Sequence, residues 1–119
     1  MYKAVVSDLD GTLLNEEHKV SPFTKETIEL LLEKGIKFYI ATGRGYVGAK
    51  EIMYEIGLKI PLITSNGARI VDENGVEIYV NNIEQKYVDK IFSIDYKSFD
   101  NGIILNGFSG NHWYVTEDA

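Results

Sequence analysis

Cysteine is absent from this chain of 119 residues. Without thiols, the sequence excludes a disulfide framework, a cysteine nucleophile and a thiolate metal site. A lack of disulfides is typical of proteins in the reducing cytoplasm. The chain also lacks an apolar run that would suit a signal peptide or a membrane span. We therefore expect a soluble, cytoplasmic protein with no membrane partner.

An excess of positive charge is missing too. The sequence has 12 Lys and Arg residues against 18 Asp and Glu residues, which gives a formal net charge of −6. Because binding to a nucleic-acid backbone needs a basic face, we expect no nucleic-acid partner. The share of hydrophobic residues, 45%, is that of an ordinary globular protein. The length allows one small domain or two incomplete ones.

The most informative stretch is AVVSDLDGTLL, at residues 4–14. Its apolar start predicts a buried strand of an α/β sheet, and ligands of such sheets bind beyond the carboxyl ends of strands. If the backbone stays extended through Leu9, Asp8 and Asp10 lie on one side with Cα atoms about 6.6 Å apart. Such close carboxylates repel unless a proton or a cation offsets their charge. The pattern favours a divalent-metal and acid/base site over its alternative, a polar strand-end turn.

Two strand–helix–strand units follow from the next sixty residues. Ser21 and Pro22 predict a helix start, and Gly35 predicts its left-handed end. A strand is expected over residues 36–41, a helix over 46–56 and a short strand over 61–64. Short connections of this kind make right-handed units with parallel strands. The inward face of the second helix is predicted to be Val47, Ile52, Met53 and Ile56.

The pattern changes near Asn66 and Gly67. Strands are expected over residues 68–72 and 76–80, joined by a hairpin turn at Glu73-Asn74-Gly75. Beyond them the sequence predicts a helix from Glu84 to about Tyr96, then strands over 103–105 and 113–116. Parallel α/β structure thus gives way to an antiparallel α+β unit. We predict domains at residues 1–66 and 67–119.

Three motifs together resemble one known family. DLDGTLL after a hydrophobic strand resembles the signature of the haloacid-dehalogenase-like phosphohydrolases. With IATGR at residues 40–44 and ITSNGA at 63–68, essentially the whole chain resembles the Cof-type sugar-phosphatase branch. The resemblance implies a Rossmann-like parallel three-layer α/β core, incomplete here, followed by the start of an α+β cap. It also implies Mg²⁺-dependent hydrolysis of a small phosphorylated metabolite, a phosphate monoester of the phosphosugar kind.

The same resemblance assigns roles to the two carboxylates. Asp8 is expected to be the nucleophile that forms an aspartyl-phosphate, with one of its oxygens on Mg²⁺. Asp10 is expected to act as general acid and then general base, and its backbone carbonyl is expected to bind the metal as well. Hard oxygen ligands of this kind suit Mg²⁺.

Four further residues are expected to hold the substrate. Thr42 and Gly43 would bind phosphoryl oxygens, Arg44 would reach phosphate or sugar, and Asn66 would face the substrate at the cap junction. Each has a structural alternative. Thr42 would then only cap a helix, Arg44 would be a solvated charge at a helix start, and Asn66 would belong to a plain Asn-Gly turn.

Two other functional classes stay open. Residues 43–48 match the G-x-G-x-x-G fingerprint of a dinucleotide-binding module, with Asp72 as a candidate ribose ligand. Against this, the fingerprint normally follows the first strand of its unit, and Asp72 precedes a hairpin turn. The chain could also be a non-catalytic interaction protein.

Two motifs of the family are missing before Ala119: the lysine that neutralises the nucleophile and the later acidic motif that completes the Mg²⁺ site. We therefore expect an N-terminal fragment with weak or no activity alone. The substrate is not identified, because specificity would lie largely in the cap.

Without a second neighbour, the first strand would leave Val5 and Val6 at an exposed apolar edge. If the 119-residue chain is stable alone, we expect it to self-associate through that edge. Sedimentation velocity over a range of concentrations would reveal this association, and a monodisperse monomer would contradict it.

Overall fold

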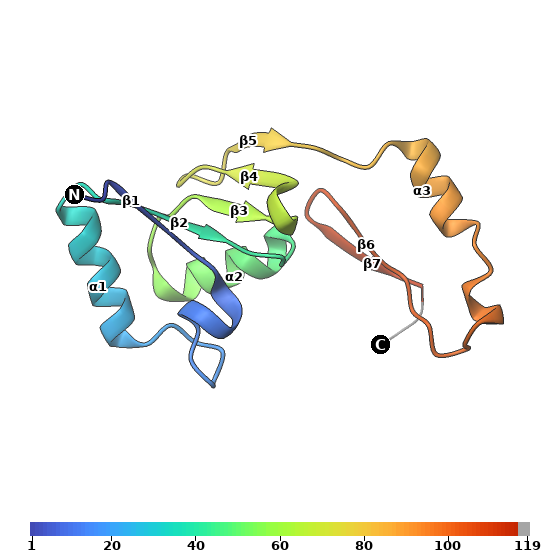
Figure 1. The fold of residues 1–119 in the computed structure, drawn as a ribbon, viewed down its shortest axis with the longest axis horizontal. Helices are drawn as coiled ribbons and strands as arrows, with labels where there is room; N and C mark the ends of the chain where they lie inside the picture. The colour runs from blue at the N-terminus through green and yellow to red at the C-terminus, as the bar shows by residue number, and fades with distance from the viewer. Residues whose placement is uncertain (117–119) are drawn as a thin grey trace. The chain divides into compact units, whose positions relative to one another are not determined.

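The computed structural model describes residues 1–116, and the chain divides into compact units at residues 1–80 and 81–119. The first unit is built on a five-stranded sheet with the strand order β1-β2-β3-β4-β5 (Figure 1). Its strands are β1 (Ala4–Ser7), β2 (Lys37–Ala41), β3 (Leu62–Thr64), β4 (Arg69–Val71) and β5 (Glu77–Val80).

The first three strands are parallel, as the sequence predicts. Ser7 is paired with Ile40 between β1 and β2, and Ala41 with Ile63 between β2 and β3. β4 and β5 then add in antiparallel fashion. The expected α/β fold class is confirmed, and the carboxyl ends of β1, β2 and β3 lie at one edge of the sheet.

Helix α1 (Pro22–Glu33) begins and ends where the sequence indicates. The Oγ of Ser21 accepts a hydrogen bond from the Thr24 amide at 3.1 Å, and Pro22 occupies the first helical turn. Gly35 follows with φ at +75°, a left-handed conformation that side chains disfavour. Ile28 is the buried residue of this helix.

Helix α2 (Tyr46–Ile56) has the predicted bounds but a different inward face. Ile52, Met53 and Ile56 are buried, whereas Val47 is 37% exposed, so its predicted inward position is wrong. Ala49 is buried instead. Ala49 precedes Ile52 and Met53 by one helical turn, while Val47 falls outside that stripe.

Both helices pack on one face of the sheet, α1 against β2 and α2 against β3 (Figure 1). Right-handed crossovers that advance from β1 to β3 put both on the same side. Phe38 and Ile40 of β2 are accordingly buried, whereas Tyr39 on the opposite face is half-buried and Val6 of β1 is 59% exposed. The described residues of this unit thus supply two layers of the expected three-layer core.

A hairpin joins β4 to β5 through the predicted Asn-Gly turn. Asp72 Oδ1 accepts hydrogen bonds from the amides of Asn74 at 2.9 Å and Val76 at 2.8 Å. Gly75 has φ at +79°. The hairpin belongs to the first compact unit, which extends to Val80. The domain division at residues 66 and 67 stays a prediction.

The second unit contains α3 (Gln85–Phe92), a 3₁₀ turn at Tyr96–Ser98, and the antiparallel strands β6 (Asn106–Ser109) and β7 (His112–Val115). The helix ends at Phe92, before the predicted Tyr96, because the chain turns at Ser93 and Asp95. The strand predicted over 103–105 lies at β6 instead, since Gly110, with φ at +56°, allows a tight turn between Ser109 and His112. No helix among residues 1–116 is long and apolar enough to cross a membrane.

Two glycines near α2 should respond in opposite ways to alanine. Gly57 caps the helix with φ at +65°, and a Cβ there would meet only Lys25 Nζ at 4.0 Å. We expect Gly57→Ala to destabilise the first unit by about 1 kcal/mol through backbone strain. Gly48→Ala, inside the helix, should stabilise it by about 0.5–1 kcal/mol. Urea unfolding followed by circular dichroism measures both, and changes of the same sign would contradict this account.

Candidate functional site

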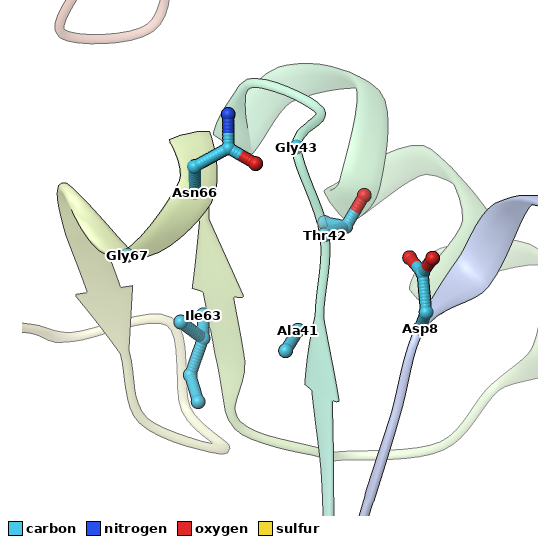
Figure 2. A pocket seen from close by; sticks show the side chains of 7 residues that line it. All are labelled: Asp8, Ala41, Thr42, Gly43, Ile63, Asn66 and Gly67. Carbon is cyan, nitrogen blue, oxygen red and sulfur yellow. The ribbon is translucent and has the colours of Figure 1, made fainter.

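A cavity of about 330 Å³ lies at the carboxyl ends of the parallel strands (Figure 2). Four of the six predicted site residues line it: Asp8 after β1, Thr42 and Gly43 after β2, and Asn66 after β3. Figure 2 shows the Asp8 carboxylate and the Thr42 hydroxyl directed toward the same end of the strands. The cavity lining is completed by Ala41, Ile63 and Gly67.

The segment after Asp8 corrects the expected geometry of the two carboxylates. β1 ends at Ser7, and the backbone then makes one wide turn over Leu9–Leu13, closed by a 3.0 Å hydrogen bond from the Leu14 amide to the Leu9 carbonyl. Leu9 is fully buried and Gly11 adopts φ of +74°. The backbone is therefore not extended through Leu9. The alternation of side chains along a strand does not determine the side on which Asp10 lies.

Asp10 is bound by Arg44 rather than exposed to the cavity. Arg44 Nε donates to Asp10 Oδ2 and Arg44 Nη2 donates to Asp10 Oδ1, both at 2.7 Å. The Asp10 side chain remains 45% exposed and that of Arg44 35%. The hydrogen bonds from Arg44 lower the pKa of Asp10 below its usual value, and the same bonds raise the pKa of Arg44. This pair is the strongest electrostatic feature of the site.

The backbone of Arg44 is fixed by two neighbouring loops. Its amide donates to Thr42 Oγ1 at 3.1 Å, and its carbonyl accepts a hydrogen bond from the Ser65 amide at 2.8 Å. Thr42 thus holds the loop before α2, whereas the N-cap of that helix is Gly45 and makes no side-chain cap hydrogen bond. Because a hydroxyl both accepts and donates, the Thr42 proton can still be donated to a ligand in the cavity.

The segment after β3 has an uncommon backbone that aims Asn66 at Gly43. Ser65, Asn66 and Gly67 have φ of +50°, +55° and +93° in succession. The Asn66 amide donates to the Thr42 carbonyl at 3.2 Å. A Cβ at Gly43 would lie 3.0 Å from Asn66 Oδ1, so a larger residue would push the carboxamide back from the close approach that Figure 2 shows. The carboxamide and the Gly43 backbone form one wall of the cavity.

The donors present fit a sparsely coordinated Mg²⁺. Asp8 Oδ1 accepts a hydrogen bond from the Leu9 amide at 2.7 Å, which leaves Asp8 Oδ2 available at the cavity. Both carboxylate oxygens of Asp10 are occupied by Arg44, so its backbone carbonyl is the better candidate ligand. Mg²⁺ commonly binds one or two protein carboxylates and completes its shell with water and phosphate oxygens. Within residues 1–116, no three His, Cys, Asp or Glu side chains gather as a fuller metal cluster.

Contacts within the protein account for residues 43–48, which match the dinucleotide-binding fingerprint, and for Asp72. Gly43, the first glycine of the fingerprint, lies against the Asn66 side chain, which accounts for a glycine at this position. Asp72 closes the β4–β5 turn through its two backbone hydrogen bonds. The geometry therefore favours the phosphatase interpretation of residues 43–48.

Sequence reasoning missed the pairing of Asp10 with Arg44. A signal was present: each residue lies three positions beyond the end of its strand, and the two strands, β1 and β2, are parallel neighbours. Equal offsets from neighbouring strand ends bring side chains close together. The predicted substrate contact of Arg44 stays a prediction.

Comparison with known proteins gives consistent matches. Residues 5–119 match the family model of the haloacid dehalogenase-like hydrolases. A protein of Buchnera aphidicola subsp. Baizongia pistaciae, provisionally named a phosphatase, is 46% identical over 99% of this chain and 43% of its own length. The HMP-PP phosphatase of Yersinia pestis (strain Pestoides F) is 33% identical over 97% of this chain and 41% of its own length. The chain thus spans about two fifths of these relatives.

Solved structures agree with this result. A haloacid dehalogenase-like hydrolase from B. subtilis superposes with a TM-score of 0.86 and 30% identity, over 98% of this chain and 40% of that one. The sugar phosphatase BT4131 superposes with a TM-score of 0.71 and 30% identity, over 95% of this chain and 43% of that one.

The Asp10–Arg44 pair predicts a specific pH dependence. Because the folded state lowers the pKa of Asp10, the contribution of the pair to stability is complete above the usual Asp value of about 3.9. It is lost as the pH falls through the lowered value. We expect an NMR titration to place Asp10 below that usual value and Arg44→Gln to raise it. An Asp10 pKa that is the same in both proteins would contradict the pairing.

Proposed function

Because this chain belongs to the haloacid dehalogenase-like hydrolases, we propose that the cavity beyond β1, β2 and β3 is the phosphate site of a Mg²⁺-dependent phosphatase. The observation that carries the proposal is the convergence of three groups on that cavity. Asp8 brings a carboxylate, Thr42 a hydroxyl and Gly43 a backbone without a side chain. These are a nucleophile and two means of holding phosphoryl oxygens.

Asp8 is the proposed nucleophile. Its Oδ2 would attack the phosphorus of a phosphate monoester, forming an aspartyl-phosphate as the bond from phosphorus to the alcohol oxygen breaks. The Leu9 amide holds the other oxygen, Oδ1, at 2.7 Å and so fixes the rotation of the carboxylate. A carboxylate that is already oriented needs little rearrangement to reach an in-line position.

Asp10 is the proposed general acid and base. The departing alcohol oxygen would receive a proton from Asp10, and Asp10 would later accept a proton from the water that attacks the aspartyl-phosphate. That second attack breaks the bond between phosphorus and Asp8, releases phosphate and restores the carboxylate. Paired with Arg44, Asp10 is a carboxylate, which is the form needed in the second step, so for the first step it would take up from solvent the proton that it passes to the alcohol oxygen.

Phosphate binding is proposed for Thr42, Gly43 and Asn66. The Thr42 hydroxyl and the Asn66 carboxamide can each donate a hydrogen bond to a phosphoryl oxygen. The absence of a side chain at Gly43 lets the phosphate approach the backbone.

Mg²⁺ would be held by the Asp8 carboxylate and the Asp10 backbone carbonyl. When bound, the ion would offset the negative charge that Asp8 and the phosphoryl group bring together.

We propose a small phosphosugar as the substrate and the cytoplasm as the location. The structural similarity to the sugar phosphatase BT4131 supports the substrate class. The similarity to HMP-PP phosphatases makes HMP-PP the first alternative substrate to assay. The lack of cysteine fits a reducing compartment.

Asp8→Asn tests the nucleophile in the protein that carries this chain, produced at its natural length. We expect phosphatase turnover to fall by more than about 1,000-fold, because an amide oxygen cannot form the aspartyl-phosphate. A chelator should abolish wild-type turnover and Mg²⁺ should restore it. Measurement of inorganic phosphate release from a panel of sugar phosphates provides the readout.

The matched control is Glu26→Gln, which removes an exposed carboxylate from α1. This control should keep wild-type turnover. Metal-dependent hydrolysis that survives in Asp8→Asn would remove Asp8 from the proposed role, and a wild-type protein without hydrolysis would refute the proposed function.

A further inference from the structure

We infer that Arg44 is a positioning residue for Asp10 and not a ligand of the substrate phosphate; this inference rests on the proposed phosphatase function. From the sequence, Arg44 is expected either to reach substrate phosphate or sugar or to be a solvated charge at a helix start. The structure instead directs the guanidinium to the carboxylate of Asp10, with two parallel hydrogen bonds of 2.7 Å.

The geometry of the pair is suited to orienting a carboxylate. A planar guanidinium that engages both carboxylate oxygens fixes the plane and the rotation of that group, which a single hydrogen bond does not. Asp10 needs such support, because it follows a buried Leu9 and precedes Gly11 on a wide turn, with its side chain 45% exposed. Within residues 1–116, the side-chain hydrogen bonds that restrain the Asp10 carboxylate come from Arg44.

Arg44 is itself held in place from three directions. Its side chain binds the loop after β1 through Asp10, its amide binds Thr42 after β2, and its carbonyl binds Ser65 after β3. One residue therefore connects the loops that follow all three parallel strands. Arg44 therefore fixes the position of the Asp10 carboxylate relative to the loops that follow β2 and β3.

The lining of the cavity supports the same conclusion. Asp8, Thr42, Gly43 and Asn66 line it, whereas Arg44 and Asp10 do not. The Arg44 stem instead runs beside the first turn of α2, where its Cδ would lie 3.9 Å from a Cβ at Gly48. The guanidinium has thus already committed two of its five N–H donors to Asp10, outside the cavity.

The test separates turnover from phosphate binding in the protein produced at its natural length. We expect Arg44→Ala to lower kcat by roughly 10- to 100-fold, because a small misplacement of a catalytic group has an effect of this size. The dissociation constant of inorganic phosphate, measured by calorimetry with Mg²⁺ present, should change by less than about 2-fold, which is the deviation typical of independent sites. The matched control is Lys25→Ala on α1, whose exposed pair with Glu29 spans 4.0 Å.

Two further measurements examine how Arg44 acts. Added guanidinium ion should restore part of the kcat of Arg44→Ala, whereas Arg44→Lys should stay impaired, because an ammonium group cannot make two parallel hydrogen bonds. In an Asp10→Asn background, Arg44→Ala should have no further effect on kcat, since the two residues act as one unit.

The outcomes distinguish this inference from the proposed function. A phosphate dissociation constant that rises 10-fold or more in Arg44→Ala would overturn the positioning role and establish Arg44 as a phosphate ligand. An effect of Arg44→Ala that persists in full in the Asp10→Asn background would overturn it as well. A wild-type protein that shows no hydrolysis is a different result, because it refutes the proposed phosphatase function.

Discussion

The parallel pairing of β1, β2 and β3 is the constraint on which the site depends. Register fixes Ser7 opposite Ile40 and Ala41 opposite Ile63, so the three strands end at one edge of the sheet. Each strand is followed by a loop that contributes polar groups. Because parallel strands require long crossovers, α1 and α2 are part of the same constraint, and the core beneath them keeps the strand ends in register. The chemistry of the edge thus depends on apolar packing below it.

Hydrogen bonds between the loops stabilise a backbone that is unfavourable by itself. Ser65 and Asn66 are left-handed without being glycine, at a cost of about 1–2 kcal/mol per residue. Their amides bind the carbonyls of Arg44 and Thr42, and Thr64, which precedes them, is fully buried with its hydroxyl on the Arg69 carbonyl. The surrounding contacts therefore offset the strain, and the resulting conformation directs Asn66 toward Gly43.

Sequence reasoning succeeded where local pattern and topology agree. Strand ends in an α/β sheet predicted that Asp8 and Thr42 would lie side by side, the family resemblance added Asn66, and the cavity is lined by all three. It failed at the wide turn after Asp8. The side chain of Leu9 is buried in the core, and the backbone turns there instead of continuing the alternation of a strand. Arg44 was expected to reach substrate phosphate or sugar. In the structure it binds Asp10, whose position is set by that same turn. In the second unit, β6 shifted because the tightness of the turn at Gly110 was not recognised.

The separation of β1 from its partner has a consequence for synthesis of the chain. Ala4 pairs with Lys37, about 33 residues further along. At roughly 5–20 residues per second, a ribosome needs about 2 to 7 s to make that interval. During this time the first strand has no hydrogen-bonding partner from its own sheet. The residues made first are thus among those that must wait for a partner, whereas the β4–β5 hairpin can pair as soon as its turn has been made.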